Sequence, residues 1–214
     1  MRVRTMKKPS TLIFAVLLVL CLPAAQTATV EGPLDLIRGT TEDVLSALKQ
    51  TPRLRNDPDE LQQLVKDVVL PHFDLPALSQ LTLGKYWRQA TPEQRARFTS
   101  EFAELLIRTY SSSLAQHANH GIEHELLSRQ EDKRGATVRS RIARPGEAAI
   151  VIDYRLRPVG NSWRIYDVAI EGVSMAVNYR ATFSDEIRRG GLDTLIESLA
   201  TRNANEGSAQ RSES

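Results

Sequence analysis

Apolar residues recur with a helical period in the first and last parts of this chain, and with a period of two between them. The helical spacing begins at Pro33–Gln50, where we expect an interruption at Gly39. Asp57-Pro58 and Thr91-Pro92 are capping signals that open two further helices. The helix opened by Thr91 is the longest and is expected to end near His117. The residues expected on the buried face of this helix are Phe98, Phe102, Leu105, Leu106, Tyr110 and Leu114.

Alternating apolar and polar residues predict strands in the middle of the chain. On the strand before Pro158, the residues Ile150, Ile152, Tyr154 and Leu156 share one face. On the next strand Tyr166, Val168 and Ile170 share a face. Short turns join consecutive strands, so we expect an antiparallel meander with one covered face. The four expected strands are Ile122–Ser128, Ala136–Ala143, Ala148–Arg157 and Trp163–Glu171.

Helical spacing returns after the last strand, in Met175–Arg189 and Leu192–Ala200, with Gly190-Gly191 between them. Residues 203–214 are polar and are expected to form a disordered tail. The fold class is therefore α+β: a twisted antiparallel sheet of about four strands covered by N- and C-terminal helices. This arrangement resembles the cone of nuclear-transport-factor-2-like (NTF2-like) proteins, whose curved sheet and helices enclose an apolar cavity. The period alone is compatible with both a solid core and a hollow one.

The N-terminus has the pattern of a cleaved export signal. Four basic residues between Arg2 and Lys8 precede the apolar segment Thr11–Leu22, and small residues follow up to Ala28. We therefore assign 1–28 to the signal and 29–202 to a single domain. Cys21 follows a leucine rather than the small residue of a lipoprotein signal, so it is expected to be discarded. The mature chain then holds no thiol for a disulfide, a nucleophile or a metal.

Removing the signal also reverses the sign of the net charge. The full chain has 28 basic and 26 acidic residues, and four of the basic ones lie in the signal, which leaves 24 against 26. A formal charge of −2 removes the compositional support for nucleic acid as a partner. No later segment is long and apolar enough to span a bilayer, so we expect a soluble product.

Gly172-Val-Ser174-Met-Ala176 superficially matches the nucleophile elbow of a hydrolase. An elbow serine requires a histidine base, which follows the serine in that fold. The four histidines, at 72, 117, 120 and 124, all precede Ser174. The strands before Ser174 are also joined by short turns rather than helices. A small polar residue at a strand-to-helix joint is the favoured interpretation.

Two other groups of residues invite a chemical interpretation. His117, His120 and His124 have spacings compatible with a metal, but Gly121 favours a solvated helix end. Asp153 and Asp167 on adjacent strands could form a carboxylate pair for acid–base chemistry. Their neighbours, Arg139, Arg141 and Arg155, favour an outward face of ion pairs instead.

Six ordered blocks along the chain resemble the MlaC (toluene-tolerance) family of periplasmic proteins that carry phospholipids between membranes. Each block is weak alone, but the ordered set covers nearly the whole mature chain. The blocks are Leu70–Asp74, Leu83–Gln94, Leu106–Tyr110, Trp163–Asp167, Glu171–Met175 and Gly190–Ile196.

The resemblance implies a periplasmic carrier that performs no chemical step and uses no cofactor. Its ligand would be a phospholipid, and its partners an outer-membrane lipoprotein–porin complex and an inner-membrane ABC transporter with an MCE-type ring. Two alternatives stay open: a small-molecule enzyme on the same fold, with polar groups near Tyr154 or Asp153, and an adaptor that binds only proteins. The residues expected to line the lipid cavity are Leu106, Tyr110, Ile152, Tyr154, Val168, Ile170, Val173 and Met175.

Overall fold

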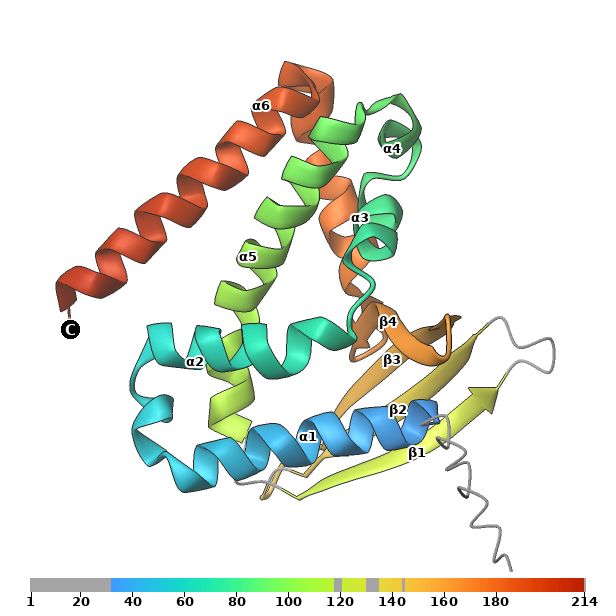
Figure 1. Ribbon diagram of the computed structural model, residues 1–214, viewed down its shortest axis with the longest axis vertical. Coiled ribbons are helices and arrows are strands. Elements are labelled where there is room, and N and C mark those ends of the chain that lie inside the picture. Colours follow the sequence, from blue (N-terminus) through green and yellow to red (C-terminus); the bar gives the residue numbers. More distant parts are fainter. Residues whose placement is uncertain (1–31, 118–120, 130–134, 144, 214) are drawn as a thin grey trace, which may run out of the picture.

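The computed structural model describes residues 32–117, 121–129, 135–143 and 145–213. The predicted signal, with Cys21, lies outside these residues. The chain forms helices, then a sheet, then a kinked C-terminal helix (Figure 1). The helical elements before the sheet are α1 (Pro33–Gln50), η1 (Pro52–Arg55), α2 (Pro58–Leu64), η2 (Val65–Val69), η3 (Leu70–His72), α3 (Leu75–Leu83), α4 (Lys85–Gln89) and α5 (Pro92–His117).

Helix α1 is continuous, so the interruption expected at Gly39 was wrong. The hydroxyls of Thr40 and Thr41 each donate a hydrogen bond of 2.8 Å to the backbone carbonyl four residues earlier. The two threonines are thereby accommodated inside the helix without breaking it.

Both predicted capping signals are confirmed. The Asp57 carboxylate accepts hydrogen bonds from the N–H groups of Asp59 (3.1 Å) and Glu60 (3.0 Å) at the start of α2. At the start of α5, the Thr91 hydroxyl accepts from the Gln94 N–H, and the Gln94 side chain accepts from the Thr91 N–H. This reciprocal pair is a capping box, which satisfies two amides that have no partner inside the helix.

The sheet has five strands in the order β1-β2-β3-β4-β5, and each neighbouring pair is antiparallel. The predicted meander is confirmed and gains a short fifth strand. A two-residue turn joins the last two strands, with positive φ at Glu171 (50°) and Gly172 (79°), as the tight turns of hairpins require. The strands are β1 (Ile122–Arg129), β2 (Ala136–Ile142), β3 (Ile150–Val159), β4 (Ser162–Ile170) and β5 (Val173–Ser174).

A β-bulge at Tyr166 changes which side chains of β4 face the helices. Arg155 pairs with Asp167, but Leu156 pairs with Ile165, so Tyr166 has no partner on β3. The extra residue moves the β4 side chains before it to the other face. Ile165 therefore joins Val168 in the buried cluster on the covered face. The prediction that Tyr166 shares this face with Val168 and Ile170 was wrong.

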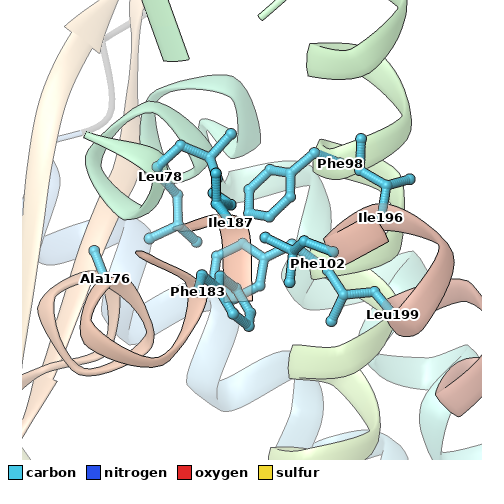
Figure 2. Close-up of a cluster of buried hydrophobic side chains, with 10 residues drawn as sticks. Leu78, Phe98, Phe102, Ala176, Phe183, Ile187, Ile196 and Leu199 are labelled. Carbon is cyan, nitrogen blue, oxygen red and sulfur yellow. The ribbon is translucent and has the colours of Figure 1, made fainter. Parts of the chain in front are cut away.

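Helix α1 lies across the β1–β2 part of the sheet (Figure 1), and its buried residues Leu36 and Ile37 pack on the covered face. A second cluster holds α3, α5 and the helix after the sheet together. Figure 2 shows Phe98 and Phe102 of α5 beside Phe183, with ring centroids 5.8 and 5.7 Å from that of Phe183. The first cluster borders the cavity described below, because Ile37, Ile165 and Val168 belong to both.

The C-terminal helix α6 (Met175–Glu213) has a kink at Gly191, where φ is 85° and ψ is 171°. The predicted pair of helical segments separated by Gly190-Gly191 is thus confirmed. The helix continues past residue 203, where composition predicted a disordered tail. Asn203 is buried, and its side-chain amide donates to the Glu101 carboxylate at 2.7 Å. This contact ties the end of α6 to α5.

Candidate functional site: an apolar cavity under the sheet

A cavity of about 500 Å³ lies between the covered face of the sheet and the helices α1 and α5. Its volume is within the range of about 300–1,000 Å³ that is typical of ligand pockets. Aliphatic and aromatic side chains dominate its wall. The helical side contributes Ile37, Val44, Leu45, Val65, Val69, Leu70, Phe73, Leu106, Ile107, Tyr110 and Leu114, and the sheet side contributes Ile122, Ile142, Ile150, Ile152, Tyr154, Ile165, Val168 and Ile170.

Seven of the eight residues predicted to line a cavity do line this one. They come from α5 (Leu106 and Tyr110), from β3 and β4, and from the first residue of α6: Leu106, Tyr110, Ile152, Tyr154, Val168, Ile170 and Met175. Val173 does not line it. This side chain is 59% exposed on the two-residue edge strand β5, past the tight turn.

Several lining residues were missed from the sequence. They belong to α1 and to the turns of helix that follow α2, such as Val44, Val65 and Phe73. The helical spacing of apolar residues within Pro33–Gln50 and after the cap at Asp57 is the signal that could have found Val44 and Val65. Periodicity marks such residues as buried but does not separate those that face a cavity from those that fill a core.

Several polar groups of the cavity wall already have hydrogen-bond partners within the protein. The Ser140 hydroxyl lies 2.7 Å from Nδ1 of His124 and also bonds the Tyr154 hydroxyl. The hydroxyls of Thr40 and Thr41 donate to their own helix. An apolar guest would therefore leave these polar groups paired.

Burial keeps the ionisable groups of the wall uncharged. It raises the pKa of Tyr110 to about 12, with a further contribution from Tyr179, and it also raises the pKa of Tyr154. The pKa of His124 is lowered, first by burial and then by the positive charge of Arg38. The wall thus presents a neutral surface at pH 7.

The outer face of the sheet carries ion pairs, as the sequence predicted. Arg139 binds the Asp153 carboxylate through two nitrogens, at 2.6 and 2.7 Å. This contact lowers the pKa of Asp153. Arg155 binds Asp167 at 2.9 Å, but Asp167 is buried, so this pair does not lie on an open surface as the sequence predicted. Asp153 is therefore an ionised surface residue on the face opposite Tyr154, and it cannot serve as a cavity acid or base.

Ser174 is a helix cap. Its hydroxyl donates to the Asp167 carboxylate at 2.7 Å and accepts from the backbone N–H of Val177 at 3.2 Å, at the start of α6. The Asp167 carboxylate also accepts from the Ala176 N–H at 3.3 Å. These contacts confirm the strand-to-helix joint predicted in place of a nucleophile.

Over the described ranges, no group of three or more His, Cys, Asp and Glu residues is arranged to hold a metal ion. His120 lies outside these ranges. Within the part of the chain that the structure describes, no helix combines the length and the apolar character needed to cross a bilayer.

The fold and the cavity define a class of protein: an α+β binding protein with an apolar pocket between its sheet and its helices. Residues 38–201 match the family model described as MlaC protein. The match covers more than half of the chain, so this chain belongs to the MlaC family.

Curated relatives and a solved structure agree with this membership. The chain is 28% identical to the toluene tolerance protein ttg2D of Pseudomonas putida, over 81% of this chain and 82% of that protein. It is 27% identical to the intermembrane phospholipid transport system binding protein MlaC of Haemophilus influenzae, over 81% and 84%. A structure of the phospholipid-binding protein from Ralstonia solanacearum in complex with a phospholipid matches with a TM-score of 0.70 and 32% identity. That match covers 80% of this chain and 97% of the other.

Membership in this family of binding proteins decides against one alternative left open by the sequence, a small-molecule enzyme on the same fold. The chain is a non-enzymatic lipid carrier of the MlaC type rather than an enzyme on a similar fold. The apolar cavity is therefore the candidate binding site.

Proposed function

We propose that this protein carries a phospholipid through the periplasm, with the acyl chains in the apolar cavity and the headgroup toward solvent. The observation that carries the proposal is the cavity of about 500 Å³ between sheet and helices, in a chain similar to a protein solved with a phospholipid. The seven predicted residues in its wall, from Leu106 to Met175, would contact the acyl chains.

The energetics of acyl chains in water support an enclosed site. Each methylene kept from water is worth about 0.8 kcal/mol. Two long chains therefore represent on the order of 20 kcal/mol, which an open surface patch would not offset. A wall of isoleucine, leucine, valine and tyrosine side chains supplies the required environment, and the polar groups of His124 and Ser140 in it are already paired.

The predicted export signal and the family relatives support a periplasmic location and a place in a lipid transport system. The carrier would exchange its lipid with an outer-membrane lipoprotein–porin complex on one side. On the other side it would meet an inner-membrane ABC transporter with an MCE-type ring. Because the chain performs no chemistry, the direction of net transport is set by these partners.

The proposal is tested by native mass spectrometry of the mature protein, purified from cells without detergent, followed by solvent extraction of the bound material. We expect a stoichiometric adduct with the mass of a phospholipid, and phospholipid in the extract. A protein that is free of lipid, and that also fails to bind added phospholipid, would contradict the proposal and favour an adaptor that binds only proteins.

A further inference from the structure

A second, smaller pocket lies outside the apolar cavity and shares none of its lining residues. Its volume is about 420 Å³, and it is formed where α3, α4 and α6 meet β3 and β4. Three of its residues are arginines: Arg88 from α4, Arg157 from β3 and Arg180 from α6. Gln80 and Tyr166 add neutral polar groups to the lining. Nothing in the carriage of an acyl chain requires this pocket.

Arg180 is held in place by the end of helix α3. Its Nε donates to the Leu81 carbonyl at 2.8 Å, and one of its terminal nitrogens donates to the same oxygen. The side chain passes over Gly84, where a Cβ atom would lie 3.5 Å from the Arg180 Nε. A guanidinium has five N–H donors, so this arrangement leaves others for a ligand.

Arg157 is also fixed before any ligand arrives. Its Nε donates at 2.6 Å to the Asp74 carboxylate, which at the same time caps α3 by accepting from the Ala77 N–H. This pair neutralises one of the three positive charges. Directly opposite Arg157 on β4 lies Arg164, whose hydrogen bonds go to Ser162 and to the Trp163 carbonyl. Arg164 is not part of the pocket lining, but its positive charge lies beside the pocket.

Arg88 is exposed, and within the described part of the chain its side chain has no hydrogen bond or ion pair. With Asp74 compensating Arg157, two of the three guanidinium charges stay uncompensated within the pocket. A phosphate monoester carries about −1.5 to −2 charges at pH 7 and offers three acceptor oxygens. Arginine is well suited to bind such a group, because its planar fork can donate two hydrogen bonds at once.

We infer that the pocket formed by Arg88, Arg157 and Arg180 binds a phosphate monoester, at a site separate from the acyl-chain cavity. A carboxylate has one negative charge and would leave part of the pocket charge unmatched. The phosphate comes either from a soluble phosphate compound or from a lipid whose headgroup is a phosphate monoester, such as phosphatidic acid. The chemistry of binding is the same for both sources.

The test is a titration of the mature protein with inorganic phosphate at constant ionic strength, followed by NMR chemical shifts. We expect saturable shifts at Gly84 and its neighbours. Arg88→Gln should weaken the affinity about tenfold or more. This substitution leaves the fold intact because Arg88 binds no other described residue. Arg189→Gln, which removes an exposed arginine of α6 outside the pocket, should change the affinity less than about twofold.

Two results would overturn the inference: no saturable binding of phosphate by the unmodified protein, or equal affinities in Arg88→Gln and Arg189→Gln. Co-sedimentation with vesicles then identifies the source. Binding to phosphatidylcholine vesicles that contain phosphatidic acid, lost in Arg88→Gln and retained in Arg189→Gln, assigns the site to a lipid headgroup. Saturable binding of free phosphate without such vesicle binding assigns it to a soluble compound.

Discussion

The Ser174 hydroxyl donates a hydrogen bond of 2.7 Å to the carboxylate of Asp167, which is only 1% exposed. The same hydroxyl caps α6 by accepting a hydrogen bond from the Val177 N–H. Arg155, on the neighbouring strand β3, also donates to the Asp167 carboxylate. Asp167 therefore ties together β3, β4 and the start of α6. The short sequence from Gly172 to Ala176, which resembles a catalytic motif, is a structural joint next to the cavity.

Replacing Ser174 with alanine should lower the free energy of unfolding by about 1–3 kcal/mol. The helix loses its cap, and the buried carboxylate of Asp167 loses one hydrogen bond. Urea denaturation measures the change. The variant should still carry phospholipid, because Ser174 does not line the cavity. Normal stability combined with loss of the lipid would contradict the structural role.

A charge inside the cavity should prevent lipid binding, whereas the same charge just outside should not. Ile152→Glu places a carboxylate in the wall, where an ionised group next to acyl chains is strongly unfavourable. Val173→Glu makes the same kind of change on the exposed edge strand. We expect phospholipid to be absent from Ile152→Glu and present in Val173→Glu, as measured by native mass spectrometry. Circular dichroism should show that both variants are folded. Loss of lipid in Val173→Glu alone would contradict the assignment of the wall.

His124 should make the protein less stable in mild acid. Burial and Arg38 lower its pKa in the folded state from the ordinary value of 6.5. The unfolded chain then binds more protons than the folded one as the pH falls below that value. The contribution of His124 to stability is therefore present above about pH 6.5 and is lost as the pH falls through the folded-state pKa.

The measurement is the free energy of unfolding across this range for the unmodified protein and for His124→Gln. Glutamine does not titrate and is able to bond the Ser140 hydroxyl. We expect a flatter pH dependence in the variant. Identical pH profiles for the two proteins would show that His124 does not contribute.

A side chain at position 191 should destabilise the protein. Its φ of 85° and ψ of 171° fall in a region that is essentially restricted to glycine. Gly191→Ala should cost about 1–3 kcal/mol of stability, although no atom lies within 4 Å of the added Cβ position. Thermal or urea unfolding would detect this loss. An unchanged stability would mean that the kink is not required in solution.

The sequence predicted the elements of this fold well where one local signal decides them. Asp57-Pro58 and Thr91-Pro92 began helices as expected, because capping depends on residues within one turn. The prediction of which β4 side chains face the helices was partly wrong. The bulge at Tyr166 depends on pairing with β3, and alternation within one strand does not reveal it. Helix α4, after Gly84, was missed because it has only five residues.

The wall of the candidate site could be predicted where alternation along a strand decides which face a side chain is on. Residues such as Ile152 and Val168 face the helices by simple alternation, and the structure places both in the cavity wall. Val173 was included because it lies in a sequence block shared with the family. Membership in such a block does not determine exposure, since the tight turn after Ile170 leaves Val173 on an edge strand.

In the proposed carrier, acyl chains occupy the cavity between the sheet and the helices. A photo-crosslinking amino acid placed at Ile152 or at Val173, and irradiated in living cells, tests it most directly. We predict a covalent phospholipid adduct, identified by mass spectrometry, from position 152 and little or none from position 173. An adduct from position 173 without one from position 152 would contradict the claim and place the lipid outside the cavity.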